Sequence, residues 1–219
     1  DEKRKEKVAY YCNMSKEDVI SNPDLNTIYE VPLVLAAQNF DTKVLDKLGL
    51  EENTANLKDW EEFVHKISAK KKHKTTIAII AKYIATGDFE LQDSYVSLIE
   101  SLNFASWNYD IDLKILFINA EELENGEKQA LESLKKARGI IVPIGWGERG
   151  VEGKIQAIKY ARENKVPYLG LCYGMQLASV EFARNIVGLK EAHTTEVAPE
   201  TPHPIIHDIP FEEKYQRIK

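Results

Sequence analysis

The chain has 219 residues and a formal net charge of -6 at pH 7, and only two of its residues are cysteines, Cys12 and Cys172. This length suits one large domain or two small ones, and the acidic balance argues against a general nucleic-acid-binding protein. Two distant cysteines do not form a disulfide framework, so a cytoplasmic protein is expected. The longest apolar runs are strand-sized and the N-terminus is highly charged, which predicts neither a membrane span nor a signal peptide.

The first 65 residues contain short elements separated by turn signals. Residues 8–12 are predicted to form a short strand, and Asn22-Pro23-Asp24 is predicted to form a turn. Helices are expected around residues 31–38 and 42–48, and Gly49 ends the second. One more amphipathic helical face is formed by Leu57, Trp60, Phe63, Val64 and Ile67.

A basic stretch follows, with five lysines in residues 66–74. Such a cluster is able to contact phosphates, but no aromatic stacking residues are interleaved, which favours a solvated linker. We therefore predict a linker at residues 66–75 between a first domain, residues 1–65, and a second, residues 76–219.

The second domain has a regular alternation of strand and helix patterns. Near-continuous apolar strands that alternate with helices predict an α/β fold, with a parallel sheet covered by helices on both faces. Ligands in such folds bind at the carboxyl ends of the strands. The expected strands are residues 76–81, 113–118, 139–143 and 166–171, and the expected helices are 94–103, 127–137, 154–164 and one that follows Cys172.

Cys172 lies where the last predicted strand turns into a helix, and Gly170 and Gly174 flank it. Glycines two residues either side leave room for a sharp turn that holds its central residue exposed. The unpaired N–H groups at the start of the helix favour the thiolate form of a cysteine. We interpret Cys172 as a nucleophile, and the alternative is a buried structural cysteine at a strand end.

A thiolate that attacks an amide carbonyl needs hydrogen-bond donors for the developing oxyanion. The backbone N–H of Tyr173 is one candidate, and Gly145, in the loop after the preceding strand, offers another. The nucleophile also needs a base, but none of the five histidines stands in a pattern that indicates this role. His203 and His207 have a proline between them, so no metal site is predicted.

The sequence around Cys172, residues 170–176, resembles the nucleophile motif of class I (triad) glutamine amidotransferases. A wider set of segments is similar to the CTP synthase family in particular. The residues 142–154 resemble its oxyanion and effector loop, and the resemblance covers nearly the whole chain in the family's order. The other matching segments are 11–13, 19–21, 28–33, 82–83, 93–95, 160–164, 181–185, 194–196 and 203–205.

This resemblance implies a flavodoxin- or Rossmann-like class I glutaminase domain, preceded by the C-terminal part of a synthetase (amidoligase) domain. The family makes CTP from UTP, ATP and glutamine, and the ammonia released from glutamine travels from one domain to the other. It implies a cytoplasmic homotetramer, with filaments as a further assembly, GTP as activator, and Mg²⁺ held with ATP by residues outside this chain. Neither nucleic acid nor membrane is an expected partner.

The resemblance also implies roles for individual residues. Cys172 is the implied glutaminase nucleophile, and Lys7 is implied to contact UTP or CTP. The segment Pro23, Asp24 and Leu25 is implied to border ATP. The oxyanion and glutamine-binding residues are Gly145, Tyr173, Gly174, Met175, Gln176 and Glu196, and those implied to bind GTP are Trp146, Arg149 and Glu152. The alternative for Trp146 is a buried side chain that anchors the loop.

The chain also departs from the family pattern. Ile144 and Trp146 replace a glycine and a phenylalanine in the loop, and neither the ATP phosphate loop nor the catalytic His-Pro-Glu is found in these residues. We therefore expect an internal segment of a CTP synthase that is inactive alone. The alternatives are a glutaminase domain that serves another acceptor and a non-catalytic assembly module with the same fold. The synthetase-like pattern of residues 7–33 argues against the first alternative.

Overall fold

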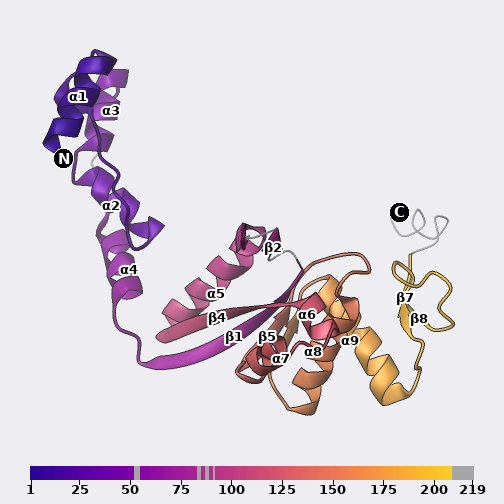
Figure 1. Ribbon diagram of the computed structural model, residues 1–219. Helices are drawn as coiled ribbons and strands as arrows, with labels where there is room; N and C mark the ends of the chain where they lie inside the picture. The colour runs from indigo at the N-terminus through magenta and orange to yellow at the C-terminus, as the bar shows by residue number, and fades with distance from the viewer. Residues whose placement is uncertain (52–54, 83–84, 87–88, 91, 209–219) are drawn as a thin grey trace, which may run out of the picture. The chain divides into compact units, whose positions relative to one another are not determined.

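The computed structural model describes residues 1–51, 55–82, 85–86, 89–90 and 92–208 (Figure 1). The chain divides into two compact units, Asp1–Lys70 and Lys71–Lys219. No helix of the described residues is long and apolar enough to cross a membrane. The elements of the first unit are α1 (Glu2–Cys12), η1 (Lys16–Asp18), η2 (Ile28–Glu30), α2 (Val31–Ala36), α3 (Phe40–Leu48) and α4 (Lys58–Ser68).

The strand predicted at residues 8–12 is wrong, because these residues form the end of helix α1. The Asp1 side chain accepts a hydrogen bond from the Lys3 N–H at one end of the helix, and Asn13 closes the other end in a left-handed conformation. Between these caps lies a run of glutamate, lysine and arginine, which favour helix. Good caps and helix-forming neighbours outweigh the β preference of the residues that precede Cys12.

A small aromatic cluster joins two elements of the first unit. The Trp60 indole N–H donates to the Tyr29 carbonyl over 2.8 Å, and the rings of Tyr29 and Phe63 meet edge to face at 5.5 Å. These contacts fasten η2 to α4. Helix α4 ends at Ser68 and the first strand of the second unit begins at His73, so both ends of the predicted linker lie in regular elements.

The second unit contains a four-stranded parallel sheet of order β4-β1-β5-β6. Its long central strand, β1, pairs with β4 from His73↔Ile111 to Ala81↔Asn119. The prediction of a parallel α/β fold is confirmed. The strands are β1 (His73–Ala81), β4 (Ile111–Asn119), β5 (Gly139–Val142) and β6 (Tyr168–Gly170), and the short pairs are β2 (Ala85–Thr86) with β3 (Phe89–Glu90) and β7 (His193–Thr194) with β8 (Pro204–Ile206).

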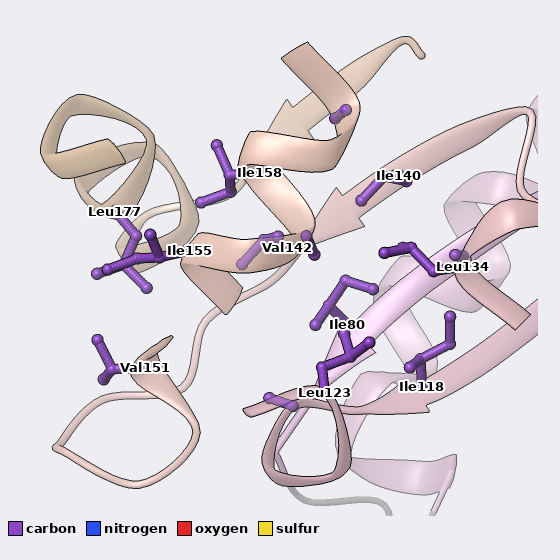
Figure 2. Packing of buried hydrophobic residues seen from close by; sticks show 14 of the residues in the cluster. Ile80, Ile118, Leu123, Leu134, Ile140, Val142, Val151, Ile155, Ile158 and Leu177 are labelled. Atoms are coloured by element: carbon purple, nitrogen blue, oxygen red, sulfur yellow. The ribbon is translucent and has the colours of Figure 1, made fainter. Parts of the chain in front are cut away.

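Helices cover both faces of the sheet (Figure 1). Successive residues of a strand point to opposite faces, so in β1 Ala78 and Ile80 belong to one core cluster while Ile79 and Ala81 belong to another. Figure 2 shows the larger cluster, where strand side chains meet those of the helices. The elements are η3 (Gln92–Tyr95), α5 (Val96–Asn108), α6 (Ala120–Glu124), α7 (Lys128–Lys135), α8 (Val151–Glu163), α9 (Tyr173–Phe182) and a π-helical turn, η4 (Ala183–Val187).

A buried ion pair joins the last turns of α8 and α9. The Arg162 guanidinium donates to both carboxylate oxygens of Glu181, over 2.8 to 3.1 Å, and the Asn185 amide donates to the same carboxylate. The Glu181 side chain is 2% exposed, whereas that of Arg162 is 30% exposed. A carboxylate this deeply buried needs such partners to remain charged.

Candidate active site

Cys172 occupies a strained turn between β6 and α9. Its φ and ψ angles are 53° and −102°, a left-handed backbone conformation that residues other than glycine rarely adopt. It caps the N-terminus of α9 and is exposed to solvent. The alternative of a buried structural cysteine is therefore wrong. Backbone strain of this kind is typical of functional sites, because the surrounding structure must hold it in place.

The two flanking glycines are required by close backbone approaches. A Cβ atom at Gly174 would lie 2.0 Å from the Val142 carbonyl oxygen of β5. A Cβ atom at Gly170 would lie 2.6 Å from the backbone nitrogen of Met175. The Leu171 N–H donates to the same Val142 oxygen over 3.0 Å, which holds the turn against the sheet. The absence of both side chains allows Cys172 to stand at the carboxyl end of the sheet.

Tyr173 follows Cys172 and begins helix α9, where the first N–H groups lack an intrahelical acceptor. Its side chain is fully buried, and its ring lies 5.2 Å from that of Trp146 and 5.3 Å from the Lys154 ammonium nitrogen. Burial raises the pKa of the Tyr173 hydroxyl to about 12, so the ring stays neutral at physiological pH. Tyr173 therefore joins the cysteine turn to the loop after β5.

Three polar contacts hold the glycine-rich loop after β5. The Lys154 ammonium donates to the Gly145 carbonyl over 3.0 Å, and the Lys82 ammonium donates to the Trp146 carbonyl. The Gly147 N–H donates to Oε1 of Glu196 over 3.0 Å. The loop is thus fixed at two successive carbonyls and at the amide that follows them.

Sequence reasoning missed the two lysines as site residues. Lys154 is completely buried, and its pKa falls to about 8 because of this burial and the nearby charge of Lys82. Burial, followed by the charge of Arg149, also lowers the pKa of Lys82. One signal was present in the sequence: Lys154 lies on the same helical face as Val151 and Ile158, where a solvated lysine is not expected.

The residues implied to bind glutamine surround the start of α9 and the loop. Met175 is exposed, and Gln176 is half-buried with an Oε1 atom that is buried and has no hydrogen-bond partner among the described residues. Glu196 lies on the segment after β7 and contacts the loop at Gly147. A buried acceptor without a partner leaves hydrogen-bonding capacity for a ligand amide or ammonium group.

The residues implied to bind GTP have partners within the chain. Arg149 forms an ion pair with Glu121 over 3.0 Å. Glu152 forms an ion pair with Arg184, which contacts both carboxylate oxygens over 2.8 and 3.0 Å. The ring of Trp146 packs at 39° against that of Tyr173 yet keeps 43% of its surface exposed.

The histidine nearest in sequence to Glu196 is engaged elsewhere. Nδ1 of His193 accepts the Thr194 N–H over 2.8 Å, and Nε2 lies 4.0 Å from Glu152. Burial lowers the pKa of the His193 ring, which keeps it neutral. No group of three or more histidine, cysteine, aspartate or glutamate side chains suited to a metal ion occurs within the described ranges.

The remaining implied site residues belong to the first unit. Lys7 is exposed on α1, and Pro23, Asp24 and Leu25 lie in the irregular segment between η1 and η2. They therefore stand in a different compact unit from Cys172.

Two family models match the chain. One is described as glutamine amidotransferase class-I and matches residues 90–213, and the other is described as CTP synthase N-terminus and matches residues 1–50.

Curated relatives match along nearly the whole chain. The CTP synthase of Sulfurisphaera tokodaii is 47% identical over 218 residues, which are 100% of this chain and 40% of the relative. That of Shouchella clausii is 49% identical over 206 residues, 94% of this chain and 37% of the relative. The chain thus spans about two fifths of the length of these relatives.

A solved structure is similar to part of the chain. It is the glutaminase domain of Trypanosoma brucei CTPS with bound acivicin, which is 34% identical and superimposes with a TM-score of 0.56. The match covers 62% of this chain and 50% of that one.

Proposed function

Because the chain belongs to the glutamine amidotransferase class-I family, we propose that Cys172 attacks the side-chain amide of glutamine and releases ammonia for the synthesis of CTP. The observation that carries this proposal is the exposed cysteine on a strained strand-to-helix turn, at the carboxyl end of a parallel sheet. The whole reaction is the ATP-dependent amination of UTP, as the resemblance to the CTP synthase family implies; the relatives carry the name CTP synthase.

The proposed chemistry uses the contacts around the turn. The Cys172 thiolate adds to the amide carbon, and the carbonyl electrons move to oxygen. The C=O bond then re-forms as the C–N bond breaks, and the leaving NH2 group takes one proton from water and departs as ammonia. The resulting thioester of glutamate is then hydrolysed by water. The backbone N–H groups of Tyr173 and Gly145 stabilise the oxyanion, because such donors act where negative charge develops. Gln176 and Glu196 hold the glutamine, with Gly174 and Met175 beside them.

The nucleotide sites form the finer part of the proposal. Lys7 contacts UTP or CTP, and Pro23, Asp24 and Leu25 border ATP, which carries Mg²⁺. Trp146 supports GTP as activator because 43% of the residue's surface is exposed, and its ring is of the kind that stacks on a base. Arg149 and Glu152 bind GTP only after Arg149 leaves its ion pair with Glu121 and Glu152 leaves its ion pair with Arg184. The whole enzyme is a cytoplasmic homotetramer, and filaments are a further assembly of it.

Covalent labelling tests the nucleophile, and the chain carries its own control. Both Cys172 and Cys12 are exposed, but only Cys172 lies at the proposed site. A glutamine-like electrophile such as acivicin should label Cys172 at least tenfold faster than Cys12, and L-glutamine should slow labelling of Cys172 alone. Mass spectrometry of the digested chain measures both rates. Equal rates without protection by glutamine would favour the non-catalytic assembly module.

The link to CTP is tested in the whole enzyme by comparing its two nitrogen sources. The variant Cys172→Ser should lose CTP formation from glutamine but retain CTP formation from added ammonium ions. Loss of both activities would contradict a role confined to glutamine hydrolysis, and so would retention of both.

A further inference from the structure

Lys154 is a buried lysine that makes no ion pair with a carboxylate in the described part of the chain, although its side chain is 0% exposed. Burying an ammonium group is costly unless polar partners replace water. The partners present are the Gly145 carbonyl at 3.0 Å and the face of the Tyr173 ring at 5.3 Å. Both partners belong to the two segments that flank the proposed oxyanion site.

The geometry of the loop shows what this contact fixes. In a trans peptide the carbonyl oxygen and the amide hydrogen point to opposite sides. The peptide that joins Trp146 to Gly147 follows this rule, because its carbonyl faces Lys82 and its N–H faces Glu196. The preceding peptide joins Gly145 to Trp146. Its carbonyl, that of Gly145, accepts the hydrogen bond from Lys154, so its N–H, that of Trp146, points away from Lys154.

Gly145 itself provides a second, independent observation. A Cβ atom there would lie 2.7 Å from the Lys154 ammonium nitrogen, so the glycine is what admits the lysine to the loop. A glycine is also the residue whose backbone rotates most freely. The Lys154 hydrogen bond restrains the peptide after residue 145, and without it this peptide is free to turn at the glycine.

We propose that Lys154 is the positioning residue of the oxyanion site: it holds the peptide that follows Gly145, and so fixes one side of the residue whose N–H is the proposed oxyanion donor. The tyrosine that follows the nucleophile completes the arrangement, since its ring supports the same ammonium group whose hydrogen bond orients the loop. One buried cation thereby ties together the two segments that supply the donors. This inference rests on the proposed glutaminase function and deepens it.

An aldehyde analogue of glutamine, glutamate γ-semialdehyde, measures the oxyanion site directly. The thiolate adds reversibly to the aldehyde carbon, and the electrons of the C=O bond move to oxygen, which then occupies the oxyanion position. L-Glutamate serves as the matched ligand because it lacks the aldehyde. The readout is the concentration of each ligand that halves the alkylation of Cys172 by iodoacetamide, with Cys12 as internal reference.

In the variant Lys154→Met the aldehyde concentration for half protection should rise at least tenfold. Removal of one oxyanion donor from an enzyme lowers kcat by about a hundredfold or more, and a misdirected donor should lose a part of this effect. Half protection by L-glutamate should change less than threefold. The control Lys159→Met removes a lysine from the exposed side of the same helix and should change neither value. Gly145→Ala, which displaces the ammonium group, should reproduce the selective loss.

The outcomes separate the two proposals. Unchanged protection by the aldehyde in Lys154→Met, or an equal loss for the aldehyde and L-glutamate, would overturn the positioning role. Failure of the aldehyde to protect even the unmodified chain would remove the proposed glutaminase function, and this inference with it. Should Lys154→Met not fold, unchanged protection by the aldehyde in Gly145→Ala, where the ammonium group is displaced, would overturn the positioning role.

Discussion

The backbone strain at Cys172 predicts an unusual order of stability for two substitutions. Both Cys172→Ala and Cys172→Gly remove the thiol, so the difference between them isolates the Cβ atom. At an ordinary position a variant with glycine is less stable than one with alanine by roughly 0.5–1 kcal/mol, because glycine gives the unfolded chain more backbone conformational entropy. At a φ of 53° and a ψ of −102° a side chain costs about 1–3 kcal/mol.

The strain exceeds the entropy term, so Cys172→Gly should be the more stable variant by about 1 kcal/mol. Urea denaturation of both variants of the full chain, followed by tryptophan fluorescence, measures this difference. Trp146 reports on the turn directly because its ring lies beside Tyr173. A Cys172→Ala variant that is equal to or more stable than Cys172→Gly would refute the reasoning, since it would mean that the turn is not strained.

Further predictions concern the packing and charge around the turn. Gly174→Ala should cost about 3 kcal/mol or more, because its Cβ atom meets a backbone carbonyl of β5 that cannot move aside; a smaller loss in urea denaturation would mean that the turn relaxes. Arg162→Met should cost about 3 kcal/mol by leaving the buried Glu181 carboxylate without its charged partner, and the double variant Arg162→Met/Glu181→Met should regain at least half, whereas additive losses would exclude coupling. The pKa of Lys154 is about 8 in the folded chain and 10.5 when unperturbed. Between these pH values the unfolded chain binds more protons than the folded chain, so the free energy of unfolding should rise from about pH 8 toward pH 10.5. Lys82 contributes in the same direction, so the rise should be smaller but present in Lys154→Met; an identical rise in both proteins would contradict a buried ammonium group.

The sequence predicted the second unit well because its signals are local and consistent. Apolar strand runs alternate with amphipathic helices, and Gly49 closes α3 as expected. Helix α1 was not predicted because its last residues favour a β-strand. The charged residues before them favour a helix, and together with the caps at Asp1 and Asn13 they outweigh that β preference. Helix α6 was missed as well, since five residues carry too little periodicity to register.

The candidate site was predictable where one residue type dictates the chemistry, as for Cys172 between its glycines. The supporting contacts were not, because they join distant segments. Nothing local to Lys82 indicates the Trp146 carbonyl 64 residues away, and nothing near Gly147 indicates Glu196, 49 residues on. Such pairs are set by the arrangement of the sheet rather than by any short pattern.

The paired helices α8 and α9 are braced at both ends. Lys154 meets Tyr173 at the end near the cysteine turn, while Arg162 meets Glu181 at the opposite end, about 12 Å further along α8 at 1.5 Å per residue. The two helices therefore behave as a stiff frame rather than as independent rods. If Cys172 acts as proposed, both contacts help to set the distance between its thiol and the loop after β5, so a substitution at the Arg162–Glu181 pair should change the reactivity of the thiol although neither residue lies at the proposed site.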